Sequence, residues 1–259
     1  LKFRKRFLEI FGFSLPTPFS SLAEGIVLGT KNSLDSSFYE ALKSTGTLHV
    51  VVASGTNISL IGGLFLQLLS PITGRRIALL SSLFFIWIYV FFIGFDAPII
   101  RAALMGSLVF TAQAFGRESV ALRTLFITGV VMLFINPLWL FDLGFQLSYA
   151  ATAGILLFGK NFYQLAAYTR FLPQVFKTDL AITLAAQVFV VPILFLNFGQ
   201  ISYLSPLVNM LVLWTVPIIL VGGMTGGILG VIWEPLGKLA MILLYPFLWW
   251  FVNVVEFYA

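Results

Sequence analysis

Side chains able to perform acid–base or nucleophilic chemistry are scarce in this sequence. It contains one histidine, His49, and no cysteine. A serine follows in the segment HVVVASGTN (49–57), and a serine beside a histidine is the pair that many hydrolases use. On a helix, however, the five residues from His49 place Ser54 roughly 140° further around the axis, and no second histidine could act as the base. We therefore expect Ser54 and Asn57 to satisfy the backbone of a broken or tightly packed helix.

Arg101 lies about one helical turn inside an apolar segment, DAPIIRAALMG (96–106). Asp96 is placed to cap the helix that begins near Pro98, because a carboxylate accepts hydrogen bonds from unpaired N–H groups and is favoured at the positive helix end. A charged side chain inside a membrane span is costly and is therefore a functional candidate. Two interpretations stay open: Arg101 extends back to the outer surface, or it lines a pore and contacts an anion.

Amide side chains recur in other apolar segments. Gln146 lies in DLGFQLSYAATAGI (142–155), and Gln187 and Asn209 lie in two later segments that each contain a proline. A proline inside a span frees a carbonyl group, which a nearby amide can bond. Each amide alone is typical of a hydrogen bond between helices. Together, on separate interrupted spans, they favour the lining of a polar path.

The elements that carry these residues are predicted to be membrane helices. Of 259 residues, 59% are hydrophobic and 10% are charged, and 28 are phenylalanine, whereas a soluble domain has about 25% charged residues. A soluble or disordered chain is thereby excluded, and one all-α polytopic bundle is expected. The long intervals between charges predict about eight spans, each of about 20 residues. The glycine-rich segment 222–230 is expected to be broken or re-entrant.

The few charged residues predict which loops face the cytoplasm. Basic residues occur in every second loop, whereas the intervening turns hold Asp96, Asp142 and the uncharged residues 199–202. The positive-inside rule places the basic loops in the cytoplasm, and position 46 then lies outside. The basic loop residues are Arg75, Arg76, Arg117, Arg123, Lys160, Arg170, Lys177 and Lys238.

The N-terminal region has a different pattern. Residues 1–13 place apolar and basic side chains at helical spacing, which predicts an amphipathic helix lying in the lipid headgroup layer. Residues 14–45 are expected to be extracellular or re-entrant, and residues 46–258 form the transmembrane bundle of a single membrane-embedded domain. Because the chain begins at Leu1, we expect it to be a segment of a longer protein.

Several blocks of the sequence, in order and with similar spacing, resemble the competence domain of the ComEC family over about residues 14–225. The blocks are LAEGIVLGTKNSL (22–34), HVVVASGTN (49–57), DAPIIRAALMG (96–106), NPLWLFDLGFQLSYAATAGI (136–155), AAQVFVVPILFLNFGQIS (185–202) and NMLVLWTVP (209–217). The resemblance implies a bacterial inner-membrane channel that passes single-stranded DNA to the cytoplasm during natural transformation. It also implies partner domains in the same protein, namely an extracellular oligonucleotide-binding-type domain before the bundle and a metallo-β-lactamase-like domain. A cytoplasmic translocation motor is left open as a further partner.

The sequence analysis therefore predicts a non-enzymatic DNA channel in contact with membrane lipids, without metal or cofactor. The outer basic surface where DNA would arrive is assigned to Lys2, Arg4, Lys5 and Arg6. The alternative is a secondary transporter of a small polar or anionic solute; an intramembrane hydrolase and a structural anchor are less favoured. The residues predicted to line the DNA path are His49, Ser54, Asn57, Arg101, Gln146, Gln187 and Asn209.

Overall fold

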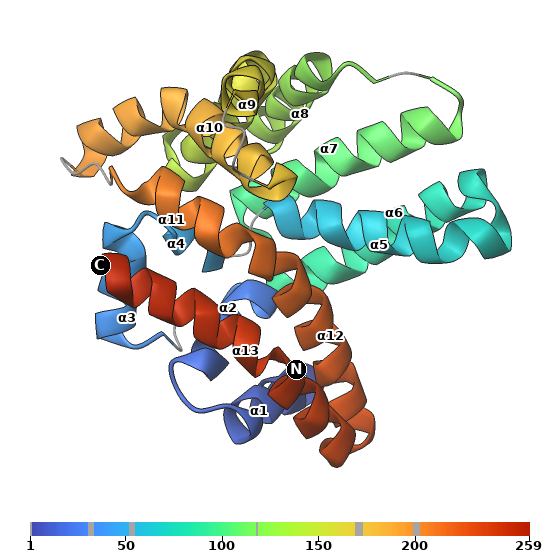
Figure 1. Cartoon of the computed structure of the whole chain (residues 1–259). Coiled ribbons are helices and arrows are strands. Elements are labelled where there is room, and N and C mark those ends of the chain that lie inside the picture. Colours follow the sequence, from blue (N-terminus) through green and yellow to red (C-terminus); the bar gives the residue numbers. More distant parts are fainter. Residues whose placement is uncertain (1, 31–33, 52–54, 118, 169–172, 199–202) are drawn as a thin grey trace. The chain divides into compact units, whose positions relative to one another are not determined.

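A computed structural model describes residues 2–30, 34–51, 55–117, 119–168, 173–198 and 203–259, and these residues form an all-α fold (Figure 1). The predicted all-α class is thereby confirmed, whereas the number of about eight spans stays a prediction. The elements are α1 (Lys2–Ser14), α2 (Phe19–Leu28), α3 (Ser36–Ser44), α4 (Leu48–Val51), α5 (Gly55–Thr73), α6 (Arg75–Ile93), α7 (Ala97–Ala114), α8 (Ala121–Ile135), the 3-10 helix η1 (Pro137–Phe141), α9 (Leu143–Ala167), α10 (Gln174–Phe198), α11 (Ser205–Val212), the 3-10 helix η2 (Leu213–Thr215), α12 (Val216–Ile232) and α13 (Glu234–Tyr258).

Within the described residues, six helical segments are long and apolar enough to cross a membrane. They are α5, α6, α7, residues Gln174–Asn197 of α10, the combined α11–α12 segment Ser205–Ile232, and α13. Two further apolar helices, α2 and α8, are shorter. The two other spans that the charge pattern predicts coincide with α8 and α9.

The chain forms two compact units. Unit 1 comprises Leu1–Ala53, Ala166–Thr183 and Ser202–Ala259, and unit 2 comprises Ser54–Leu165 and Leu184–Ile201. Unit 1 therefore holds α1 to α4, the first part of α10, and α11 to α13. Unit 2 holds α5 to α8, nearly all of α9, and the rest of α10.

Glycines on α12 set the packing of unit 1. On one face, a Cβ added at Gly226 would lie 3.1 Å from the Cβ of Ala240 on α13, and one added at Gly230 would lie 3.2 Å from the Cα of Gly237. Such close approach of two helix backbones is what small residues at four-residue spacing permit in membranes. The expectation that residues 222–230 form a break is wrong, because α12 is helical throughout them.

The interruption in this segment lies earlier, at η2. There the carbonyl oxygen of Leu211 accepts hydrogen bonds from two indole N–H groups, that of Trp214 at 2.8 Å and that of Trp250 on α13 at 2.9 Å. The Thr215 hydroxyl also donates to the Val212 carbonyl at 2.7 Å. Side chains thus satisfy backbone acceptors at the 3-10 turn, as an irregular segment at membrane depth requires.

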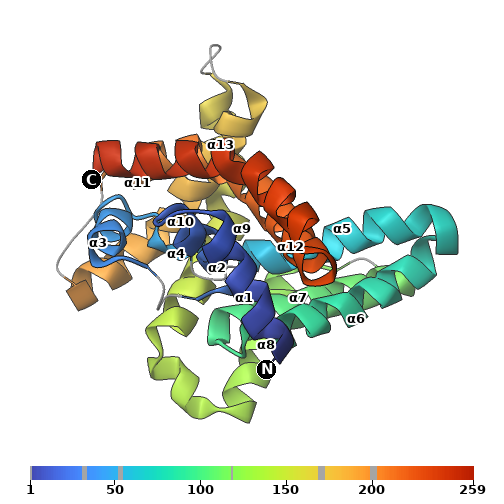
Figure 2. The same cartoon turned by 90° about the horizontal axis from the view of Figure 1, so that it is seen from below.

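Helix α1 packs against a second face of α12. The ring of Phe7 lies directly over Gly227, and Ile10 lies over Gly230, where an added Cβ would be 2.8 Å from its Cδ1 atom. Phe7 and Ile10 are 5% and 6% exposed, and Phe11 is fully buried. The apolar face that the sequence assigns to lipid is therefore covered by protein; the contact of the polar face with headgroups stays a prediction. Figures 1 and 2 show α1 beside the α12–α13 turn, while α3 lies beside the C-terminal end of α13.

In unit 2, α5, α6 and α7 pack side by side, and α7 continues into a cluster with α8 and α9 (Figure 1). The rings of Phe65 and Phe85 stack with centroids 3.7 Å apart. The α7–α8–α9 cluster is centred on Ala97, Met132 and Phe145. This cluster positions the candidate site.

Candidate functional site

The position of Arg101 inside unit 2 follows from where helix α7 begins, at the N-cap residue Asp96. Asp96 occupies the N-cap position, with φ −64° and ψ 146°, and a proline follows in the first turn. The backbone carbonyl of Asp96 accepts hydrogen bonds from the N–H groups of Ile99 and Ile100, both at 3.0 Å, whereas its carboxylate makes no capping hydrogen bond. Arg101 lies one turn further along the helix and is 8% exposed. The side chain is thus buried in protein and does not extend to the surface.

The guanidinium group of Arg101 contacts α9. Its Nε atom donates to the Ser148 hydroxyl at 2.7 Å, and its Cζ atom lies 5.9 Å from the centre of the Tyr149 ring. Within the part of the chain that the structure describes, no carboxylate forms an ion pair with Arg101. A full positive charge is therefore buried among neutral side chains, which is an unusual and costly arrangement.

Tyr149 is fixed in place by α8. Its hydroxyl group donates to the Thr128 hydroxyl at 3.2 Å, and its ring lies over Gly129, where an added Cβ would be 3.2 Å from Cε1. On α9 itself, the ring packs against Phe145 with centroids 4.4 Å apart. Helices α8 and α9 therefore position the aromatic face beside Arg101 on α7.

Other predicted path residues of unit 2 make separate contacts. Asn57 is fully buried in α5 and shares a side-chain hydrogen bond with Tyr89 of α6. Gln146 donates from Nε2 to the Leu140 carbonyl at 2.8 Å, a local bond between α9 and η1. Gln187 is half-buried on α10. Each of these three residues lies in the same unit as Arg101.

The remaining predicted path residues lie in unit 1 or outside the described residues. Ser54 is outside them. The His49 side chain on α4 is exposed, and its Nδ1 atom lies 2.9 Å from the Gly46 carbonyl oxygen. Asn209 on α11 is 1% exposed and donates from Nδ2 to the Ser205 hydroxyl at 3.1 Å. Convergence of the seven residues on one path stays a prediction.

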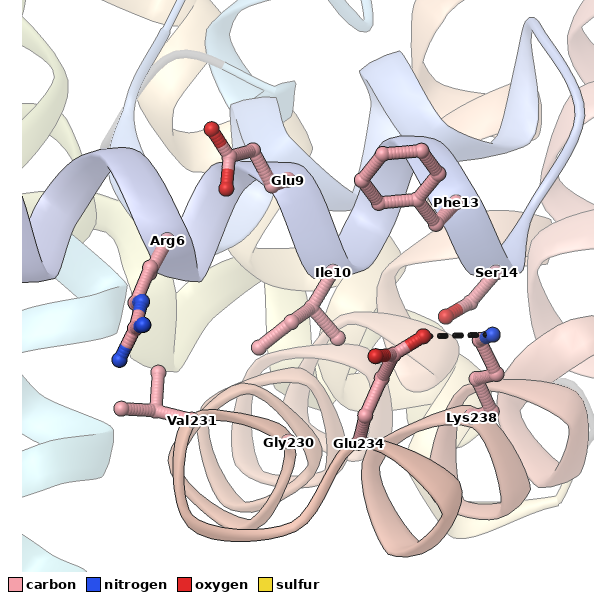
Figure 3. A pocket seen from close by; sticks show the side chains of 9 residues that line it. All are labelled: Arg6, Glu9, Ile10, Phe13, Ser14, Gly230, Val231, Glu234 and Lys238. Atoms are coloured by element: carbon pink, nitrogen blue, oxygen red, sulfur yellow. Dashed lines mark ion pairs between the residues drawn. The ribbon is translucent and has the colours of Figure 1, made fainter.

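The predicted outer basic surface is described for one of its four side chains. The side chains of Lys2, Arg4 and Lys5 lie outside the described part of the structure. Arg6 lines a hollow of about 280 Å³ between α1 and the α12–α13 turn. Figure 3 shows Ile10 and Ser14 of α1 directed toward Glu234 and Lys238, which form an ion pair at 2.7 Å.

This hollow links two predictions about membrane sides. The sequence places Arg6 outside and Lys238 in a cytoplasmic loop, yet both residues line the same hollow. A hydrocarbon core of about 30 Å separates the two sides of a membrane, far more than such a hollow spans. The two placements therefore cannot both hold.

Sequence reasoning did not select three residues that the structure makes prominent. Ser148 and Tyr149 became recognisable only as partners of Arg101. Asp179, on α10 in unit 1, is a partly buried carboxylate in a span-length helix, and its Oδ2 atom has no hydrogen-bond partner among the described residues. The signal for Asp179 was available, since it is an acidic residue that directly precedes the long uncharged stretch beginning at Leu180.

The six long apolar helices define a multi-pass membrane protein. The family model described as "Competence protein" matches residues 26–259, so the chain belongs to the competence protein family. It is 26% identical over 234 residues to ComE operon protein 3 of Bacillus subtilis (strain 168), covering 88% of this chain and 29% of that protein. It is 32% identical over 133 residues to an uncharacterized protein of Aquifex aeolicus (strain VF5), covering 51% of this chain and 32% of the relative.

The chain thus spans about three tenths of the length of the curated relatives that it matches. No solved structure matches it. The family match covers the competence membrane domain and detects no nuclease domain in this chain. Among the described residues, no group of three or more histidine, aspartate or glutamate side chains is placed to hold a metal ion.

Proposed function

We propose that this chain forms the membrane passage through which one DNA strand enters the cytoplasm during natural transformation. The observation that carries the proposal is Arg101, a buried cation on a span-length helix without a carboxylate partner among the described residues. A DNA strand carries one negative charge per nucleotide and needs positive charge along its route. Membership of the competence protein family supports the same function.

In this proposal, the protein lies in the bacterial inner membrane and crosses it eight times. Six are the long apolar segments, and α8 and α9 supply the other two. Helix α8 has 15 residues, which at 1.5 Å each gives a length of about 22 Å, so its flanking residues complete the crossing. The chain acts as one membrane-embedded domain, and the path residues predicted from the sequence line the passage.

The passage itself carries out no covalent chemistry in this proposal. The chain contains one histidine, His49. The path residues supply hydrogen bonds and charge to the passing strand. In the full-length protein, an oligonucleotide-binding-type domain receives the DNA and a metallo-β-lactamase-like domain acts on the other strand. A cytoplasmic motor is a further proposed partner that pulls on the entering strand.

Transformation of cells that carry Arg101→Ala tests the proposal. We expect DNA uptake to be lost while the variant remains inserted at the native level, as measured by radiolabelled DNA entry and by immunoblotting of membranes. Arg123→Ala is the matched control, because it removes an equal charge from an exposed position on α8. Native uptake in Arg101→Ala cells would refute the role of Arg101 in the passage.

The second candidate function is a secondary transporter of a small solute, and Asp179 is the observation that favours it. Ion-coupled transporters use a carboxylate at membrane depth, and the Oδ2 atom of Asp179 is buried without a partner among the described residues. A transporter requires this carboxylate, so Asp179→Asn would abolish its activity. Under the DNA-passage proposal, cells carrying Asp179→Asn take up DNA at the native level.

A further inference from the structure

The hollow between α1 and the α12–α13 turn lies at the level of the lipid headgroups. Helix α12 ends at Ile232 and α13 begins at Glu234, and both helices belong to segments long enough to cross a membrane. The turn between them therefore lies at a membrane surface. The side chains of Ile232 and Trp233 beside it are 77% and 59% exposed, and tryptophan is typical of the membrane–water interface.

The walls of the hollow carry equal numbers of positive and negative side chains. Arg6 and Glu9 supply one of each from α1, and Lys238 and Glu234 supply one of each from α13. Lys238 and Glu234 bind each other at 2.7 Å, whereas no described residue forms an ion pair with Arg6 or Glu9. Residues three positions apart on a helix have Cβ atoms about 5–6 Å apart. The α1 wall therefore offers a cation and an anion as neighbours.

The same hollow holds a buried hydroxyl group that lacks a partner. The Oγ atom of Ser14 is buried and makes no hydrogen bond to any described residue. Figure 3 shows Ser14 directed toward Glu234 and Lys238 across the hollow. A buried hydroxyl group without a hydrogen bond is unfavourable, because it has lost its bond to water. A ligand that accepts a hydrogen bond from Ser14 would remove this cost.

Apolar side chains complete the hollow. Ile10 and Val231 line it, and the ring of Phe13 lines it while remaining 77% exposed. Its volume of about 280 Å³ is just below the range of about 300–1,000 Å³ that is usual for pockets of drug-sized ligands. The hollow thus has room for a polar headgroup, with an apolar ring beside it for the start of an acyl chain.

We propose that this hollow binds the headgroup of phosphatidylethanolamine. The phosphate group accepts hydrogen bonds from Arg6 and Ser14, and the ammonium group, two carbon atoms away from the phosphate oxygen, donates to Glu9. The charges of the four side chains sum to zero, so an anionic headgroup gains no net attraction. A choline headgroup has no N–H donor for Glu9. The proposal is independent of DNA passage and of the side on which the turn lies.

Native mass spectrometry of the full chain, purified in dodecyl maltoside, measures the lipid preference. The chain is titrated with dioleoyl phosphatidylethanolamine, phosphatidylcholine or phosphatidylglycerol, which differ only in the headgroup. We expect phosphatidylethanolamine to bind about tenfold more tightly than the other two, because one further charge-assisted hydrogen bond has about that effect. Equal affinities for the three lipids, or tighter binding of phosphatidylglycerol, would overturn the proposal.

Two variants separate the phosphate contact from the ammonium contact. Glu9→Gln should remove the preference for phosphatidylethanolamine over phosphatidylcholine, whereas Arg6→Gln should weaken the binding of all three lipids, since each carries a phosphate group. Glu256→Gln is the matched control, because it removes the same charge as Glu9→Gln from an exposed position near the other end of α13. If Glu9→Gln and Glu256→Gln keep the same preference as the native chain, Glu9 does not bind the headgroup and the site is overturned.

Ser14→Ala gives effects of opposite sign with and without lipid. In dodecyl maltoside alone its Tm should equal or exceed that of the native chain, because an unpaired buried hydroxyl group has been removed. Added phosphatidylethanolamine should then raise the Tm of the native chain more than that of Ser14→Ala. An equal rise in both would overturn the contact with Ser14. Free O-phosphoethanolamine should compete only weakly, since it lacks the acyl chains; displacement of the lipid at equal concentration would overturn a lipid as the ligand.

Discussion

Replacing Gly227 by alanine should weaken the packing of α1 against α12 and raise the population of a state in which the two helices are apart. The ring of Phe7 lies against the backbone of Gly227, so an added methyl group would overlap the ring and lie 2.8 Å from its Cε1 atom. Helix α1 cannot relieve the overlap by a small rotation, because Ile10 is 6% exposed and packs over Gly230 on the same helix. Overpacking of this kind costs about 1–3 kcal/mol. That free energy corresponds to an increase of about 5- to 150-fold in the population of the opened state.

Thiol labelling measures this opening without interference, because the chain contains no cysteine. With Ile10→Cys as the reporter, a maleimide should react slowly in the otherwise native chain and about 5- to 150-fold faster when Gly227→Ala is added. Gly63→Ala on α5 is the control, since it introduces the same methyl group where nothing lies within 4 Å of the added Cβ. An equal labelling rate in the Gly227→Ala and Gly63→Ala backgrounds would show that α1 does not depend on contact with Gly227.

Two further outcomes are expected. Glu9 on α1 and Lys238 on α13 line the same hollow, so both positions should lie on the same side of the membrane. In intact membranes, an impermeant maleimide should therefore label Glu9→Cys and Lys238→Cys from the same side. Labelling from opposite sides would contradict the packing of α1. Tyr89→Phe removes the hydrogen bond to the buried amide of Asn57, so the free energy of unfolding should fall by about 1–3 kcal/mol and the Tm should fall with it. An unchanged Tm would show that this hydrogen bond does not stabilise the fold.

The sequence located Arg101 because a single charge in an apolar segment needs no tertiary information to be noticed. Its partners could not be found in this way. Ser148 is 47 positions away and reaches Nε only because α7 and α9 pack together. The approach of Arg101 to Gly55, where an added Cβ would lie 2.9 Å from Nη2, depends on how closely α5 and α7 approach, and no spacing along the chain encodes that distance.

The error at residues 222–230 has a physical cause. Glycine is a poor helix former in water, by about 1 kcal/mol relative to alanine, and five glycines in nine residues therefore predict a break. In a membrane, an open backbone has no water to bond, so the helix persists and the glycines serve for close packing instead. Gly226 and Gly230 face α13, while Gly223 and Gly227 receive Val27 and Phe7. The same glycines that argued for a break are the surface on which unit 1 assembles.

Because Arg6 and Lys238 line the same hollow, they also constrain how the net charge of +5 is divided between the two sides of the membrane. If the alternation of basic loops holds through the α12–α13 turn, α1 lies at the cytoplasmic face and its four basic residues join the positive loops. If α1 lies outside, as an extracellular domain directly before it would require, the alternation ends before Lys238. Labelling of Glu9→Cys and Lys238→Cys distinguishes these two topologies. Arg101 keeps its role in either case, because every contact that carries it lies within unit 2.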